Sequence, residues 1–151
     1  EELNPAAQVL QSDLDVSVSE PQALRGKRVL VIEDGPTVTH GGMGYGAGWV
    51  AAQKYEVDEL VDPAPFAVGS IADTLEKYPH LRRVLPAMGY SGEQREELKK
   101  TIESSDAEVV LNASPAGVGA LLGLTLPVVR VQYQFKPLQG VDILARVRQL
   151  I

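Results

Sequence analysis

The stretch Lys27-Arg-Val-Leu-Val-Ile-Glu-Asp34, followed at once by Gly35-Pro36, decides the fold. Its four consecutive apolar residues are mostly β-branched and end at a turn signal, which is typical of a central strand buried on both faces. Similar stretches follow at residues 108–112 and 128–133. Buried strands separated by helical patterns indicate an α/β domain with a mostly parallel sheet.

The remaining elements are predicted around these strands. Weaker strands are expected at 13–18, 59–62 and 83–86, helices at 47–55, 71–78, 92–104, 116–123 and 141–151, and a loop at 35–46. Ser91 and Gln94 have capping-box spacing, and Ser70 is predicted as another helix N-cap. We therefore expect a Rossmann-like three-layer sandwich with about five strands. It forms a single domain over residues 1–151, whose first 26 residues are less regular.

Composition excludes several classes of protein. The chain has 151 residues, a formal net charge of −6 and no cysteine. Thiol catalysis, cysteine-based zinc sites and disulfide scaffolds are therefore excluded. An acidic balance argues against nucleic-acid binding, which depends on clustered Lys and Arg. Apolar stretches are far shorter than a membrane-spanning helix needs. We expect a soluble, cytoplasmic protein with no nucleic-acid or membrane partner.

The segment after the first strand, residues 33–46, carries the candidate site. It combines two adjacent acids, two threonines, one of the two histidines and a run of glycines. An acid at the end of a buried strand can hold Mg²⁺, and glycine lets backbone N–H groups approach a phosphate closely. A following helix N-terminus favours an anion, and His40 can supply a proton or a positive charge. Together these features predict a phosphate-bearing ligand with a divalent cation.

Each feature also has a structural interpretation. The glycines permit tight turns and close packing, His40 can bond the backbone, and the two acids can simply end a strand. Gly46-Ala-Gly-Trp-Val-Ala51 matches a dinucleotide fingerprint, with Asp62 downstream, but it does not follow its strand directly. No G-x-x-x-x-G-K-[ST] loop occurs in the sequence. A non-catalytic domain that binds a phosphorylated metabolite, and a Rossmann-type dinucleotide-binding domain, therefore remain as alternatives.

The run from Gly26 to Gly48, with its Glu-Asp-Gly-Pro-Thr and Thr-His-Gly-Gly-Met blocks, resembles the cyclic 2,3-diphosphoglycerate synthetase family and its sister proteins, described as predicted GTPases. The likeness continues through residues 61–63, 67–71, 76–81 and 84–90, and covers roughly residues 18–112 with a weaker tail to about 133. Residues 112–118 depart from the Thr-Pro-Ile-Asp-Leu stretch of relatives, which puts nucleotide or metal contacts from that strand end in doubt.

The resemblance implies the carboxyl-terminal portion of a nucleotide-dependent phosphotransferase or synthetase. Its cofactors are Mg²⁺ with ATP or GTP, and its substrate is a phosphorylated small molecule. The family's nucleotide loop lies upstream of the matched region, so we expect a homo-oligomer or pairing with that missing region. The residues and the resemblance together predict these roles: metal ligation by Glu33 and Asp34; catalysis by Asp34 and His40; phosphate or substrate binding by Thr37, Thr39, Gly41, Gly42, Gly44, Gly46, Ser70 and Gly89.

Overall fold

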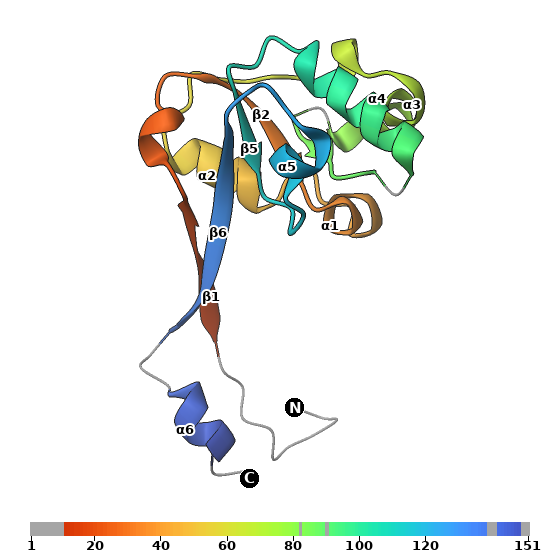
Figure 1. The fold of residues 1–151 in the computed structure, drawn as a ribbon. Coiled ribbons are helices and arrows are strands. Elements are labelled where there is room, and N and C mark those ends of the chain that lie inside the picture. The colour runs from red at the N-terminus through yellow and green to blue at the C-terminus, as the bar shows by residue number, and fades with distance from the viewer. Residues whose placement is uncertain (1–10, 82, 90, 139–141, 149–151) are drawn as a thin grey trace. The chain divides into compact units, whose positions relative to one another are not determined.

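The structure, a computed structural model, describes residues 11–81, 83–89, 91–138 and 142–148 (Figure 1). The chain divides into two units. The larger unit is Val16–Gln132, and the smaller unit combines Glu1–Asp15 with Tyr133–Ile151. In the smaller unit, the Leu138 N–H donates to the Gln11 carbonyl oxygen over 3.0 Å. No helix in the described ranges has the length and apolar character needed to cross a membrane.

The sheet has six strands and is mostly parallel. Its order is β1-β6-β5-β2-β3, and β4 also pairs with β2. β2 pairs in parallel with β3, β4 and β5, and β5 pairs in parallel with β6. One pair is antiparallel. The strands are β1 (Ser12–Val18), β2 (Arg28–Glu33), β3 (Glu59–Leu60), β4 (Leu85–Pro86), β5 (Val109–Asn112) and β6 (Val128–Pro137).

Helices connect the strands. α2 packs on β2 and β5, whereas α3 packs against α4 and α4 against α5 (Figure 1). The α-helices are α1 (Gly35–His40), α2 (Ala47–Lys54), α3 (Gly69–Lys77), α4 (Gly92–Glu103), α5 (Val118–Leu122) and α6 (Ile143–Arg148). Short 3₁₀ turns are η1 (Pro21–Ala23), η2 (Ala64–Phe66) and η3 (Pro79–Leu81). The alternation of strands and helices confirms the α/β class and is consistent with a Rossmann-like fold.

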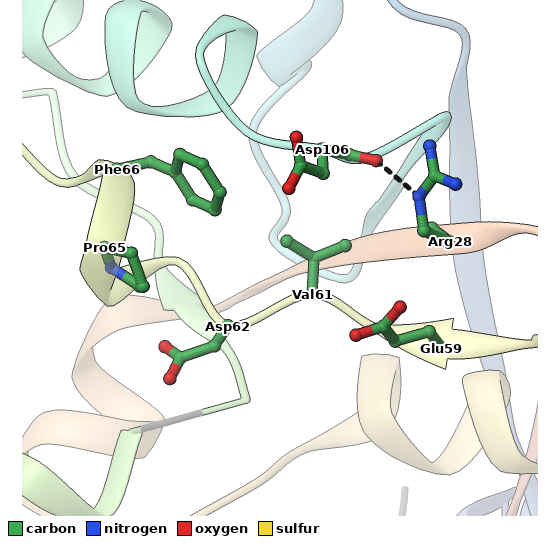
Figure 2. Close-up of a pocket in the computed structure, with 7 residues that line it drawn as sticks. All are labelled: Arg28, Glu59, Val61, Asp62, Pro65, Phe66 and Asp106. Carbon is green, nitrogen blue, oxygen red and sulfur yellow. Dashed lines mark hydrogen bonds between the residues drawn. The ribbon is translucent and has the colours of Figure 1, made fainter.

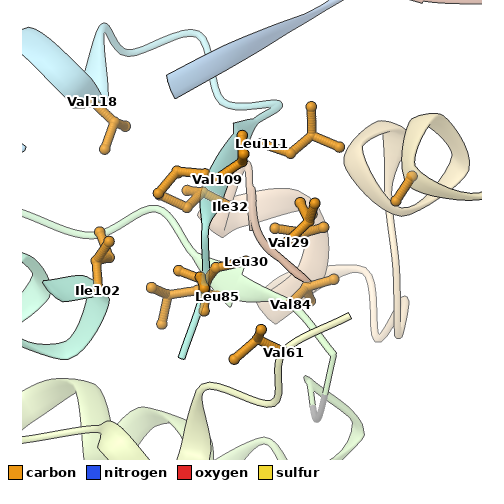
Figure 3. Close-up of a cluster of buried hydrophobic side chains, with 14 of the residues drawn as sticks. Val29, Leu30, Ile32, Val61, Val84, Leu85, Ile102, Val109, Leu111 and Val118 are labelled. Carbon is orange, nitrogen blue, oxygen red and sulfur yellow. The ribbon is translucent and has the colours of Figure 1, made fainter. Parts of the chain in front are cut away.

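The core is built on the two central strands. Residues 29–32 of β2 and 109–111 of β5 are at most 3% exposed, as continuous apolar strands covered on both faces should be. Side chains from the helices, including Ile102 and Val118, complete this cluster (Figure 3). The buried runs that predicted these strands are thus the core of the domain.

The order of the strands reverses between β2 and β5. After β2 the chain continues to β3 and β4 on one side of β2, and after β5 it continues to β6 on the other side. Such a reversal opens a crevice outside the carboxyl ends of the two strands, where α/β proteins bind their ligands. The predicted site segment begins at this point, because Asp34 directly follows β2.

Four predictions are corrected. The predicted loop at 35–46 begins with α1, since Pro36 is well placed in a first helical turn. Ser70 is not an N-cap: α3 begins at Gly69, after Val68, which makes no side-chain cap bond. The sheet has six strands rather than about five. The helix expected at 141–151 spans Ile143–Arg148, and residues 141 and 149–151 lie outside the described residues.

Candidate functional site

Asp34 stands at the junction between β2 and α1. Its backbone is extended, and its Oδ2 accepts a hydrogen bond of 2.9 Å from the Thr37 hydroxyl. A threonine hydroxyl has one hydrogen, so Thr37 faces a ligand only through its oxygen lone pairs while this bond persists. Asp34 is partly exposed and Thr37 is exposed, so that both can be reached from solvent.

His40 ends α1 and its protonation pattern follows from its neighbour. The Thr39 hydroxyl donates to the Gly35 carbonyl oxygen over 2.8 Å, and His40 Nδ1 lies 3.2 Å from the same hydroxyl oxygen. Since the hydroxyl hydrogen is already used, a hydrogen bond between this oxygen and the ring requires the tautomer in which Nδ1 is the donor. In the neutral ring this leaves Nε2 as an acceptor at an exposed position, where it can accept a proton; only the protonated ring can donate from Nε2 to a phosphate oxygen.

Glu33 has a different role from that of Asp34. Its side chain is 3% exposed, and Oε1 accepts the N–H groups of Gly46 over 3.0 Å and Trp49 over 2.9 Å. Burial raises the pKa of Glu33, and these backbone hydrogen bonds oppose that rise. The carboxylate therefore occupies the N-terminus of α2. This is the position that a pyrophosphate takes in a dinucleotide-binding domain, so the geometry disfavours that alternative.

The turn after β4 lies beside the end of β2, next to Asp34. Glu33 pairs with Pro86, and the Ala87 N–H donates to the Glu33 carbonyl oxygen over 2.7 Å. A Cβ added to Gly35 would lie 2.6 Å from the Ala87 carbonyl oxygen, so any other residue at the start of α1 would force the backbone to shift. Gly89, in the same turn, has a φ of +127°. Residue 90 lies outside the described residues.

The glycines between α1 and α2 are placed in one exposed connection. Gly41 is the C-cap of α1, and Gly42 has a φ of +62° with open space around its Cα. A Cβ on Gly44 would come 3.4 Å from the His80 carbonyl oxygen, and the Gly46 N–H is engaged by Glu33. Unlike the Gly46 amide, the amides of Gly41, Gly42 and Gly44 do not donate to Glu33 at the start of α2, and they follow α1 directly.

Ser70 is directed to another part of the molecule. Its hydroxyl and its N–H both donate to Glu97 Oε2 of α4, over 2.5 and 3.1 Å. Glu97 therefore supplies from α4 the acceptor that α3 lacks at its own N-cap. Ser70 stabilises the contact between two helices, and its hydroxyl hydrogen is committed to that contact.

Two further side chains, which were not predicted as site residues, hold the site in shape. His80 Nε2 lies 3.0 Å from the Val38 carbonyl oxygen, so it is a partner of α1 rather than of α3. Asn112, at the end of β5, accepts from the N–H and hydroxyl of Ser114 and donates to the Ala116 carbonyl oxygen. An Asn-x-Ser sequence after a strand is a signal for such a turn, whereas nothing in the sequence marks the His80 contact.

The fit for a metal ion is limited to one carboxylate. Within the described ranges, no group of three or more His, Asp or Glu residues is arranged to hold a metal ion. Mg²⁺ at a nucleotide site commonly uses one or two carboxylates together with water and substrate phosphates. Asp34 can supply one such ligand, while Glu33 Oε1 is occupied by backbone N–H groups.

Comparison with known proteins identifies a synthetase relative. The chain is 50% identical over 136 residues to the protein named arginine synthetase ArcE of Thermococcus kodakarensis. The match covers 90% of this chain but 30% of the relative's length. No protein-family model and no solved structure matches the chain. The chain is therefore a homologue of one segment of a synthetase.

Proposed function

We propose that this chain is part of a nucleotide-dependent synthetase, in which residues 34–44 bind the phosphates of ATP or GTP with Mg²⁺. The observation that carries the proposal is the 50% identity with a segment of a synthetase. The position of Asp34 and α1 at the reversal of strand order supports the location, because this crevice is where three-layer Rossmann-like domains bind ligands.

The proposed roles follow the available atoms. Asp34 provides a carboxylate toward a magnesium ion, and His40 accepts a proton at Nε2, from which the protonated ring donates to a phosphate oxygen. The amides of Gly41, Gly42 and Gly44 approach the phosphates, since glycine places no side chain in the way. Thr37 and Thr39 hold Asp34 and His40 in place through the hydrogen bonds described above.

Two candidate products of the complete synthetase reaction can be named. The resemblance indicates cyclic 2,3-diphosphoglycerate, and the name of the relative indicates arginine. Because the chain spans 30% of that relative, the complete reaction is proposed for a longer protein, formed with a further segment or by association of copies. A domain that only holds a phosphorylated metabolite is a second candidate, favoured by the lack of a G-x-x-x-x-G-K-[ST] loop in the sequence.

Calorimetry of the 151-residue chain tests the site. ATP, GTP and 2,3-diphosphoglycerate are titrated with and without Mg²⁺ into the native chain, Asp34→Asn and Asp73→Asn. Asp73 is an exposed acid of α3 and serves as the matched control. Magnesium-dependent binding that is lost only in Asp34→Asn supports the proposal. Binding that is independent of Mg²⁺ favours the second candidate, and equal binding by both variants contradicts the role of Asp34.

A further inference from the structure

A hollow lies at the end of the sheet opposite to Asp34. It has a volume of about 500 Å³, within the range of small-molecule sites, and is lined by residues that include Arg28, Glu59 and Asp106 (Figure 2). Arg28 and Glu59 begin their strands, and Asp106 precedes β5. Asp34 follows the other end of β2, six residues from Arg28, or about 20 Å along the strand.

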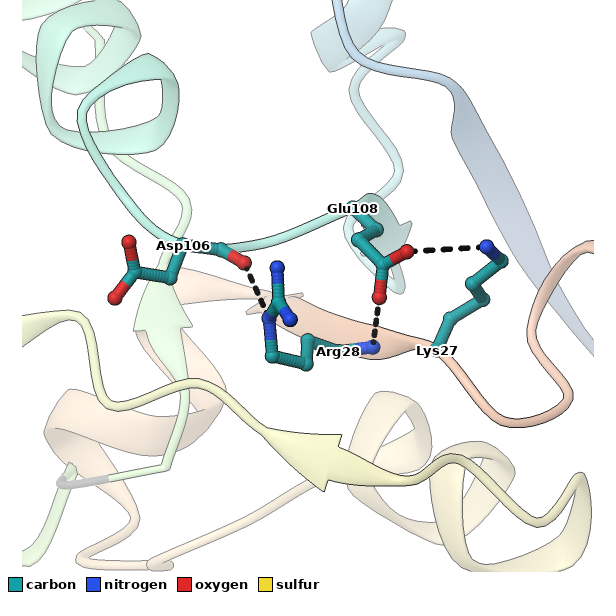
Figure 4. A network of polar contacts seen from close by, with 4 residues as sticks. All are labelled: Lys27, Arg28, Asp106 and Glu108. Carbon is teal, nitrogen blue, oxygen red and sulfur yellow. Dashed lines mark hydrogen bonds and ion pairs between the residues drawn. The ribbon is translucent and has the colours of Figure 1, made fainter.

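Arg28 is held at this hollow by its own network. Its Nε donates to the Asp106 carbonyl oxygen over 2.9 Å, and its backbone N–H donates to Glu108 Oε2 over 3.1 Å (Figure 4). Glu108 also pairs with Lys27 over 3.0 Å. The pKa of Glu108 is lowered mainly by the hydrogen bond from the Arg28 N–H and, to a smaller extent, by the one from Lys27. The guanidinium is therefore positioned before any ligand arrives.

Charges of both signs face the hollow without pairing with each other. Arg28 and Glu59 are direct neighbours in the register of β2 and β3. Nevertheless, among the described residues the Arg28 Nη atoms and the carboxylates of Glu59 and Asp106 make no hydrogen bond or ion pair. All three side chains are exposed, so that a ligand can reach them. A zwitterion is the kind of ligand that satisfies such a set.

The remaining lining selects the ligand further. Asp62 adds a third carboxylate against one guanidinium, which favours a ligand with net positive charge. Val61 and Phe66 form an apolar wall on which an aliphatic chain can pack, and a cation can lie over the Phe66 ring. A small molecule with a carboxylate, two cationic groups and an aliphatic stem satisfies all of these groups.

We propose that this hollow binds a basic amino acid, with the α-carboxylate on the Arg28 guanidinium and the cationic groups on Glu59 and Asp106. The proposal extends the proposed function, because the name of the relative indicates arginine, but it concerns a separate site. An amino acid bound here does not occupy the proposed phosphate site at Asp34. It therefore either regulates the synthetase from a second site or binds separately from the phosphates.

Calorimetry with L-arginine tests this site on the 151-residue chain. Arg28→Gln and Glu59→Gln are each expected to weaken binding about tenfold or more, as the loss of a hydrogen bond between charged groups does. Arg25→Gln and Glu76→Gln are the matched controls, since both residues are exposed and lie outside the hollow. Agmatine lacks the carboxylate, so it should bind the native chain about tenfold more weakly and be insensitive to Arg28→Gln.

Several outcomes overturn the inference. Equal heats from L-arginine and guanidinium chloride show general charge screening, and the absence of binding at millimolar arginine shows that there is no site. If Asp34→Asn abolishes arginine binding and Arg28→Gln does not, the amino acid binds at the Asp34 site and not in this hollow. Magnesium–nucleotide binding is measured on the same samples, so failure at this hollow and failure of the proposed function are distinguished. The agmatine comparison uses unaltered protein and holds even if a variant folds poorly.

Discussion

Replacement of Glu33 by alanine is expected to destabilise the fold strongly. The Glu33 side chain is 3% exposed, and its Oε1 accepts the N–H groups of Gly46 and Trp49 at the start of α2. Alanine leaves both donors without this acceptor. A lost partner costs about 1–3 kcal/mol for each buried donor, or about 2–6 kcal/mol for the two. Both bonds are only partly buried, so water limits the expected loss to about 2–4 kcal/mol.

Urea unfolding followed by far-ultraviolet circular dichroism measures this loss. Domains of this size are stable by about 5–15 kcal/mol, so Glu33→Ala should move the midpoint clearly. Glu76→Ala, at an exposed position of α3, is the control and should stay within about 0.5 kcal/mol of the native chain. If Glu33→Ala unfolds at the same midpoint as Glu76→Ala, the carboxylate does not hold α2.

The same residue gives a pH dependence with a defined sign. Burial raises the pKa of Glu33 above its ordinary value of 4.5. Between these two values the folded state retains a proton that the unfolded state has lost, so stability falls as pH rises. The stabilisation that comes from the proton retained on Glu33 is fully present below the ordinary pKa, and it is lost as the pH rises past the raised pKa. Relative to Glu33→Gln, the native chain should therefore lose unfolding free energy as pH rises above the ordinary pKa of 4.5. If the unfolding free energy of the native chain instead rises with pH relative to Glu33→Gln, the raised pKa of Glu33 is contradicted.

Three further substitutions have expected outcomes. Gly35→Ala places a Cβ 2.6 Å from the backbone oxygen of Ala87 and should lower the unfolding free energy by about 1–3 kcal/mol in urea titrations. Ser91→Ala removes the N-cap of α4 and should cost about 1 kcal/mol in the same assay. Lys27→Met should raise the pKa of Glu108 toward its ordinary value, which NMR titration of the Glu108 side chain measures.

Each of these has a matched control. Gly92→Ala meets no atom within 4 Å and should not destabilise the chain. Ser104→Ala removes an exposed serine that follows α4 instead of preceding it, and Lys100→Met removes a cation outside the Lys27–Glu108 pair. If Gly35→Ala is as stable as Gly92→Ala, the close packing of Gly35 on Ala87 is contradicted. If Lys27→Met leaves the pKa of Glu108 unchanged, the pairing of Lys27 with Glu108 is contradicted.

The regular elements could be predicted from local sequence. The apolar runs of β2 and β5 match the predicted strands to within one or two residues, because strands buried on both faces need continuous apolar side chains. Ser91 caps α4 through the Gln94 N–H, as its spacing required. The short α1 was missed, because its six residues include a glycine, a proline and two threonines, which give a weak helical signal.

The candidate site could be predicted in part. The position of Asp34 and His40 after a buried strand is a local property, so the sequence located the segment correctly on the fold. The different roles of Glu33 and Asp34 could not be predicted, since adjacent acids at a strand end alternate in direction and only packing shows which one meets α2. Ser70 was misassigned because its partner Glu97 lies 27 residues away.

The sequence by itself determined the α/β class, the central strands and the segment that carries the candidate chemistry, since periodicity and turn signals act over a few residues. Only the tertiary structure decided the reversal of strand order between β2 and β5, the place where α/β domains bind their ligands. It also brought Arg28, Glu59 and Asp106 to one hollow. Strand register and helix packing set those distances, and both depend on contacts between residues far apart in the chain.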